Sequence, residues 1–140
     1  MLTFEINVDL LSVNKLYSNI PGQARRFISK EGKAFKEAFH TIITDAIERD
    51  SLYKDISNIV GQKVAVFISV GSPTWLLKDG KSIRRKDLDN LCKALQDSVF
   101  ATLAEFEPSI DDSQIWDLHM EKRITSVPNT LITIQLYSGK

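Results

Sequence analysis

The alternation of apolar and polar residues at the start of the chain predicts a β-strand. Every second residue from Leu2 to Leu10 is apolar, whereas the residues between them are polar. This period-two pattern is typical of a strand that buries one of its faces. The same pattern from Val64 to Val70 predicts a second strand.

Two stretches near the end of the chain, residues 115–122 and 129–137, are also rich in strand-forming residues. A short segment that contains Pro128 separates them and is typical of a turn. We therefore expect these two stretches to pair with each other as an antiparallel hairpin.

Apolar residues that recur every three or four positions predict two amphipathic helices. The first helix begins near Ser29 and carries its apolar stripe as far as Ile47. The second begins after Asp87, which is well placed as an N-cap, and reaches Leu103. The predicted order is therefore strand, helix, strand, helix, strand, strand.

Two long loops separate these elements. Residues 11–28 lack periodicity and contain Arg25 and Arg26, and residues 71–82 form a second stretch of loop-forming residues. Loops of this length are often functional. Trp75 in the second loop is expected to anchor that loop to the core rather than to stack on bases.

The composition is that of one globular domain. The 140 residues are 43% hydrophobic and 26% charged, which excludes a disordered chain. No segment is apolar enough to span a bilayer, the N-terminus lacks a secretion signal, and the single cysteine, Cys92, cannot form an internal disulfide. We therefore expect a cytoplasmic protein without a membrane role. Because the net charge is zero, any nucleic-acid site must depend on local basic clusters.

The densest group of ionisable residues lies at the start of the second predicted helix. The basic residues 84–86 precede two carboxylates, Asp87 and Asp89, and a second acidic pair follows at Asp111 and Asp112. Mg2+ requires one or two carboxylates together with waters and substrate oxygens. We therefore predict a site that holds a divalent cation against a phosphodiester.

Helical geometry limits which of these residues can meet. Asp87 and Asp89 converge only if Asp87 lies outside the regular helix, as an N-cap does, because residues two apart on a helix point in nearly opposite directions. Asp89, Lys93 and Asp97 share one face at intervals of one turn. Asp112 reaches the helix start only if residues 105–112 run back along the helix.

Each of these features also has a purely structural interpretation. Carboxylates in the first turn of a helix stabilise it by capping and by interaction with its dipole. The pair Asp111 and Asp112 is typical of a turn before a strand. Lys93 could form a weak surface salt bridge with Asp89, and a basic run is usually a solvated face.

Residue spacing excludes several other chemistries. A calcium-binding EF-hand loop that began at Asp87 would require glycine and glutamate where the chain has Cys92 and Ser98. A glycine-rich phosphate loop is absent from the sequence. His40 and His119 have no partners at the spacing of a zinc site or a catalytic triad.

A series of short motifs follows the order seen in a known family. The motifs are Lys86-Asp87-Leu88-Asp89-Asn90-Leu91, Lys93-Ala94, Asp97, and Asp111-Asp112 with Gln114 and Ile115, preceded by Ser12-Val13-Asn14-Lys15-Leu16-Tyr17 and residues 29–35. With these motifs the chain resembles the RusA-type Holliday junction resolvases, which are associated with phages and prophages. The chain has Lys86 where the family commonly has arginine, and residues 101–110 look longer than usual.

This resemblance implies a single α+β domain over residues 1–140, with a mixed sheet packed against two main helices. It implies an endonuclease of bacterial or phage origin that depends on Mg2+, with Mn2+ as an alternative, and that acts in DNA recombination and repair. The expected partners are branched DNA, in particular a four-way junction, and a second copy of the chain. The two active sites of such a homodimer would face opposing strands. No small-molecule cofactor is expected.

The resemblance also assigns roles to particular residues. The metal-binding catalytic aspartates would be Asp87, Asp89 and Asp112, with Asp111 as the alternative to Asp112 and Lys93 as the active-site lysine. Basic residues would grip flanking phosphates. These DNA-binding candidates are Arg84, Arg85, Lys86, Arg25, Arg26, Lys78 and Lys81. Secondary site candidates are Asn90, Asp97, Asn14 and Tyr17.

Two other functions fit the same residues. A dimeric module could recognise branched DNA by shape and charge without cutting it. A general metal-dependent nuclease could instead use the same site on flaps or single strands.

Overall fold

A computed structural model describes residues 1–10, 17–19, 26–83 and 87–139 of the chain. Its centre is a four-stranded mixed sheet in the order β1-β6-β4-β5. The strands are β1 (Leu2–Ile6), β4 (Val64–Ser72), β5 (Ile115–Ile124) and β6 (Asn129–Leu136). A separate two-stranded sheet pairs β2 (Tyr17–Asn19) with β3 (Arg26–Ile28).

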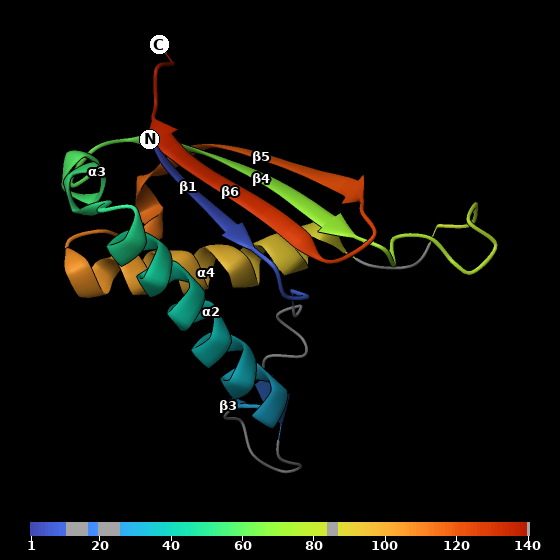
Figure 1. Cartoon of the computed structure of the whole chain (residues 1–140). Coiled ribbons are helices and arrows are strands. Elements are labelled where there is room, and N and C mark those ends of the chain that lie inside the picture. Colours follow the sequence, from blue (N-terminus) through green and yellow to red (C-terminus); the bar gives the residue numbers. More distant parts are fainter. Residues whose placement is uncertain (11–16, 20–25, 84–86, 140) are drawn as a thin grey trace.

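Two long helices, α2 (Lys30–Arg49) and α4 (Leu88–Phe106), lie against the same face of the four-stranded sheet and cross each other (Figure 1). A short helix, α3 (Tyr53–Asn58), follows α2, and a 3-10 turn, η1 (Asp112–Gln114), leads into β5. This arrangement confirms the expected α+β fold with a mixed sheet and two main helices. None of the helices in the described ranges is long and apolar enough to cross a membrane.

The core lies between the helices and the covered face of the sheet. The alternation seen in the sequence has its expected consequence, because Leu2, Phe4 and Ile6 are buried while Thr3 and Glu5 are exposed. Both helices contribute their apolar stripes to the same cluster. Its largest fully buried members from these helices and from β6 are Phe39, Ile43, Ile47, Leu95, Leu103, Ile132 and Ile134.

The predicted hairpin of the last two strands is wrong. β5 and β6 lie on opposite sides of β4, with β5 parallel to it and β6 antiparallel to it. The connection at residues 125–128 crosses the end of β4 at Gly71. A Cβ atom at Gly71 would lie 2.4 Å from the carbonyl oxygen of Asn129 and 2.8 Å from Cγ2 of Thr125. The crossing therefore depends on a position without a side chain.

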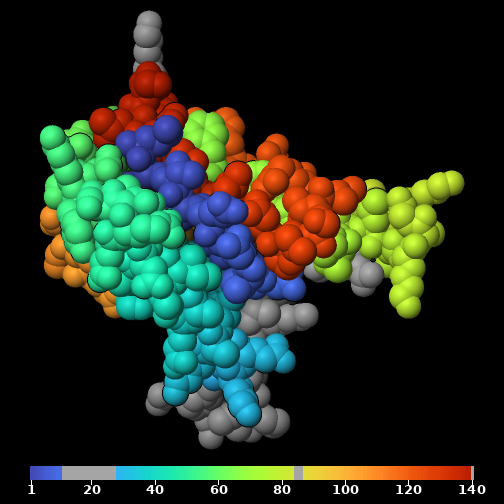
Figure 2. All heavy atoms as spheres, viewed as in Figure 1, coloured from blue at the N-terminus to red at the C-terminus, as the bar shows by residue number. Residues whose placement is uncertain are grey.

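Trp75 anchors the loop after β4, as the sequence predicts. Its side chain is buried, and its indole Nε1 donates to the carbonyl oxygens of Val70 at 3.2 Å and Arg123 at 2.8 Å. The indole therefore joins the C-terminal end of β4 to that of β5. Beyond this anchor, residues 76–83 form an arm that extends away from the body of the protein (Figures 1 and 2).

Candidate functional site

Asp87 stands at the N-cap position of α4, as the sequence predicts, but its carboxylate does not cap the helix. Its backbone is extended, with φ −78° and ψ 111°, and its side chain makes no hydrogen bond to the first-turn amides. The contact recorded for it comes from the amide of Asn90, whose Nδ2 donates to Oδ2 of Asp87 at 3.4 Å. The carboxylate of Asp87 therefore does not stabilise the helix by capping it, and it stays exposed to solvent.

Asp89, Lys93 and Asp97 form an exposed stripe along α4, because residues four apart lie on one face of a helix. Asp89 makes no ion pair with Lys93, nor with any other residue that the structure describes. The salt-bridge interpretation of Lys93 is therefore not observed. The opposite face of α4 is buried and carries Cys92, whose thiol pKa rises to about 12 because of burial and, secondarily, the charge of Asp89.

Asp111 and Asp112 lie in a tightly bonded turn. The carboxylate of Asp111 accepts from the backbone amide of Ser113 at 3.3 Å, and Oε1 of Gln114 accepts from the amide of Asp111 at 2.9 Å. The Nε2 of Gln114 donates to the carbonyl oxygens of Ile59 at 2.7 Å and Gln62 at 2.9 Å. The acidic turn is thus fixed to the segment after α3 through Gln114, a role that the sequence did not reveal.

The two carboxyl groups of this turn interact. The shared hydrogen bond with Asp111, partial burial, and the charges of Asp111 and Asp97 raise the pKa of Asp112 above its ordinary value. The same hydrogen bond, supported by the amide of Ser113, lowers the pKa of Asp111. Asp112 therefore sits in a field of negative charge whose other members are Asp111 and, on α4, Asp97.

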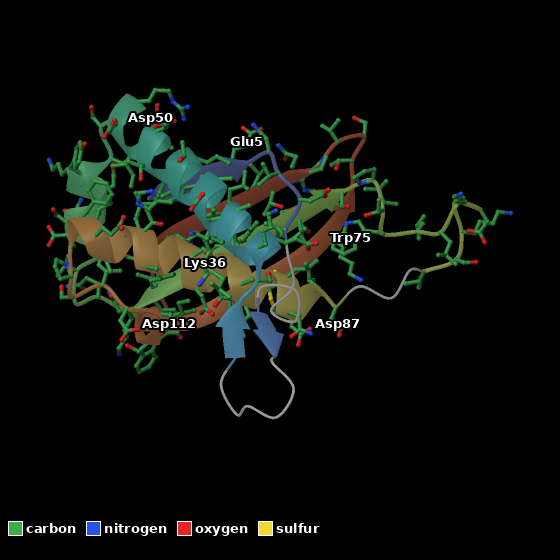
Figure 3. All side chains as sticks on the ribbon, turned by 90° about the horizontal axis from the view of Figure 1, so that it is seen from below. Glu5, Lys36, Asp50, Trp75, Asp87 and Asp112 are labelled. Carbon is green, nitrogen blue, oxygen red and sulfur yellow. The ribbon has the colours of Figure 1, made fainter. Side chains whose placement is uncertain are left out.

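The predicted metal ligands lie in two groups rather than one. Asp87 and Asp89 are at the start of α4, whereas Asp112 lies further along the helix, in the field of Asp97 (Figure 3). Within the part of the chain that the structure describes, no three His, Cys, Asp or Glu side chains are close enough to hold a metal ion together. The helix continues to Phe106, so only a short segment remains to bring the acidic turn back.

This arrangement bears on which residues fit a divalent cation. Carboxylate oxygens suit a hard cation such as Mg2+, which takes one or two of them together with waters and substrate phosphates. Asp87 and Asp89 fit this requirement in number and chemistry, and Asn90 adds an amide beside them. Asp112 does not join them in this geometry, so the three aspartates do not fit one ion as a set.

A groove between α2 and α4 begins at the acidic stripe. Its volume is about 180 Å³, and Lys36 of α2 and Asp97 of α4 contribute to its lining. Further along, Nε2 of His40 lies 2.5 Å from Oε2 of Glu105. Ser98 also lines the groove, and its hydroxyl is buried with no hydrogen-bond partner among the described residues. The contact of His40 could not be predicted from the sequence, because its partner Glu105 lies on the other helix.

The predicted DNA-binding residues are only partly described. Lys78 and Lys81 are exposed on the arm, where Leu76 pairs with Ile83 and Asp79 accepts from the amides of Lys81 and Ser82, each at 2.8 Å. These bonds lower the pKa of Asp79, with the hydroxyl of Ser82 as the largest cause.

The side chains of the other DNA-binding candidates, and of the secondary candidates Asn14 and Tyr17, are not described. Tyr17 and Arg26 lie in the paired strands β2 and β3. Five predicted positions lie outside the described residues, namely Asn14, Arg25 and the basic residues that precede Asp87: Arg84, Arg85 and Lys86.

A protein that acts on nucleic-acid phosphodiesters needs carboxylates for a cation and basic groups for phosphates, and this chain carries exposed carboxylates on one helix and lysines on a projecting arm. Residues 11–135 match the family model described as endodeoxyribonuclease RusA. The chain therefore belongs to the RusA endodeoxyribonuclease family, a family of Holliday junction resolvases that bind branched DNA. No curated protein matches the chain in a direct sequence comparison.

Proposed function

We propose that this protein is a Mg2+-dependent endonuclease that resolves four-way DNA junctions by paired symmetric cuts. It acts inside the cell, in DNA recombination and repair, and as a homodimer, because two symmetric cuts require two active sites related by a two-fold axis. The observation that carries the proposal is the family match over residues 11–135, which includes both acidic motifs.

The exposed carboxylates at the start of α4 support the catalytic part of this proposal. Asp87 and Asp89 are the side chains that would hold the cation, and neither is used to cap the helix. Mg2+ bound there would activate water and stabilise the departing oxygen of the phosphodiester. Asp112 would assist as the third acidic residue, with Asp111 as the alternative. Asp111 already accepts a backbone amide of its own turn.

Positive residues have two separate tasks in this proposal. Lys93 lies one helical turn after Asp89 and would neutralise the negative charge that grows on the phosphate during attack. Lys78 and Lys81, on the exposed arm, would contact the backbone of the flanking DNA, together with Arg25, Arg26 and residues 84–86. Contacts of this second kind fix the position of the DNA but carry no sequence information.

A cleavage assay on a four-way junction tests the proposal. The wild-type protein is expected to cut the junction with Mg2+ or Mn2+ and to be inactive in EDTA. D89N removes one carboxylate while keeping the shape of the side chain. It is expected to cut at least roughly a hundredfold more slowly at matched DNA binding. D45N, an exposed change on α2, is the control and should cut normally.

Comparison of substrates in the same assay separates the remaining functions. Preferential cutting of the junction over a linear duplex and a flap supports resolution, whereas equal cutting of flaps and single strands identifies a general nuclease. A non-cleaving branched-DNA module is favoured by one observation, the separation of Asp112 from the helix start. Tight junction binding without any metal-dependent cut would establish that module instead.

A further inference from the structure

The arm of residues 76–83 carries bulky apolar side chains outside the core. Leu77 and Ile83 are 45% and 78% exposed, and every residue from 77 to 83 is exposed. The arm extends away from the helices and the sheet (Figures 1 and 2). Packing among the described residues therefore does not account for these two side chains.

Hydrogen bonds within the arm give it a defined shape. Leu76 pairs with Ile83 as an antiparallel bridge, and the amide of Leu77 donates to the carbonyl oxygen of Ser82 at 2.8 Å. The amide of Gly80 donates to the carbonyl oxygen of Leu77 at 2.9 Å. Gly80 has a φ of 72°, a left-handed conformation that favours glycine. The arm is therefore a folded hairpin loop.

The base of the arm is fixed to the sheet. The indole of Trp75 bonds to the ends of both β4 and β5. The ammonium of Lys122, on β5, lies 4.8 Å from the centroid of the same indole ring, which adds a cation–π contact. An element that separates stacked bases needs such a support, because unstacking costs free energy.

The pairing within the arm places apolar side chains on both of its faces. Residues opposite each other in an antiparallel pair point to the same face, and neighbouring residues along a strand point to opposite faces. Leu76 and Ile83 therefore share one face, and Leu77 lies on the other. When such an arm enters a gap, it makes apolar contacts with both walls.

The charge of the arm fits a polyanion. Lys78 and Lys81 are exposed on it. The carboxylate of Asp79 accepts from the amides of Lys81 and Ser82 and from the hydroxyl of Ser82, so it is held within the arm. A DNA partner satisfies both features of the arm, because its phosphates attract the lysines and its base-pair faces accept apolar side chains.

We propose that the arm recognises the branch point of a four-way junction by inserting Leu77 and Ile83 between the base pairs that flank it. This inference rests on the proposed function, since it takes the four-way junction as the substrate. A linear duplex stacks its base pairs continuously, so opening a step costs more there than at a branch point, where the stack is already interrupted. The arm therefore favours the junction by shape and reads no base sequence.

Binding of the full chain to fluorescent DNA in EDTA tests the insertion without cleavage. The probe is 2-aminopurine, whose fluorescence rises when it unstacks, placed at the branch point of a four-way junction or within a linear duplex. Wild type should raise the fluorescence of the junction and prefer it to the duplex. L77S/I83S should lose this rise and roughly tenfold in junction affinity. Its duplex affinity and salt dependence should stay unchanged, because both lysines remain.

Matched variants separate insertion from other effects. L77I/I83L keeps apolar side chains on the arm and should behave as wild type. L136S removes an exposed leucine that pairs with Val64, at the opposite end of β4 from the arm, and should also behave as wild type. K78Q/K81Q should weaken binding of junction and duplex alike. Circular dichroism checks that each variant is folded.

The outcomes distinguish this inference from the proposed function. Wild-type protein that prefers the junction but leaves its bases stacked, or L77S/I83S that keeps the fluorescence rise, would overturn the insertion alone. Insertion without any Mg2+-dependent cut would refute only the nuclease, and a wild type without preference for the junction would refute both. A mass of DNA-free L77S/I83S that differs from wild type by light scattering would identify the arm as a contact between copies and would also overturn the insertion.

Discussion

The carboxylates of α4 and η1 differ in how far the fold already uses them. Asp111 accepts a backbone amide of its own turn, and Gln114 bonds back to its amide nitrogen, so this residue has a structural task. Asp87 contacts only the amide of Asn90 within the described structure, and Asp89 bonds to none of the described residues. A cation can therefore bind Asp87 and Asp89 with the smallest loss of hydrogen bonds that the fold already makes.

The raised pKa of Asp112 should make the free energy of unfolding depend on pH. Its folded pKa is raised, so the stabilisation from its protonated form is complete at low pH and is lost as the pH rises through that pKa. D112N removes the charge and keeps a hydrogen-bond donor for Asp111. The variant should therefore melt at a slightly higher temperature than wild type at pH 7, and the difference should vanish near pH 3. Thermal melts across this range measure it.

The acidic turn offers a matched comparison for that result. D111A removes the acceptor that caps η1, so it should lower the melting temperature by roughly a few degrees at pH 7. D112A removes no capping hydrogen bond, so it should not lower the melting temperature. If D111A and D112A melted alike, the separate roles assigned to these two neighbours would be incorrect.

Cys92 should behave as an inert core residue. Burial raises its pKa to about 12, so the thiolate fraction at pH 8 falls about a thousandfold below that of a free thiol. Its raised pKa also means that folding stability declines as the pH rises from 9.0 towards that value. The thiol of Cys92 should therefore react with a thiol reagent at pH 8 only when the protein unfolds, so the reaction should be faster in denaturant. Fast reaction of the native protein would show that α4 packs differently.

Among the elements, the connection between β5 and β6 shows that sequence patterns predict strands but not which strands are neighbours in the sheet. Period-two alternation identified β1 and β4 because it reports which residues face the core. The pattern does not report which strand lies beside which, and the short connection suggested a hairpin. Only the absence of a side chain at Gly71 permits residues 125–128 to cross the end of β4. The short elements β2, β3 and α3 span too few residues to show a period.

The crossing makes a clear prediction for stability. G71A places a methyl group against the backbone oxygen of Asn129, which cannot move away as a flexible side chain can. We expect a loss of about 2–4 kcal/mol in the free energy of unfolding, measured by urea denaturation. S126A, in the same connection, is the control and should be nearly neutral. A neutral G71A would contradict the crossing over β4.

The candidate site was predictable to the same limited extent. The residue types and their order made Asp87, Asp89 and Lys93 candidates for the site, and the predicted N-cap position of Asp87 is confirmed. The position of Asp112 was not predictable, because it depends on where α4 ends and on the bonds that Gln114 makes to the segment after α3. Such contacts between distant segments leave no periodic signal in the sequence.

For the molecule as a whole, net charge is a poor guide to its partner. The chain carries equal numbers of basic and acidic residues, yet Lys78 and Lys81 lie together on an arm that leaves the body of the protein (Figure 2). The carboxylates of the candidate metal site lie at α4 and η1 instead. A protein with this distribution can bind a polyanion through one region while it presents acidic groups to a cation in another.

The arm should contribute to DNA affinity in a salt-dependent way. The double variant K78Q/K81Q is expected to weaken junction binding and to reduce the slope of log affinity against log salt by about one to two. Fluorescence anisotropy with a labelled junction at several salt concentrations measures both quantities. The double variant K33Q/K54Q changes two exposed lysines elsewhere and should leave the slope nearly unchanged. If the slope were unaltered in K78Q/K81Q, the arm would not be part of the DNA-binding surface.

Binding of Mn2+ to the DNA-free protein, followed by electron paramagnetic resonance, tests directly whether the carboxylates at the start of α4 hold a metal ion. The carboxylates at the start of α4 should hold the ion, so D87N and D89N should each weaken binding at least roughly tenfold, while D45N should not. D112N should have the smaller effect, because Asp112 lies apart from the other two. Binding that persists unchanged in the double variant D87N/D89N would contradict a metal-dependent site at this helix.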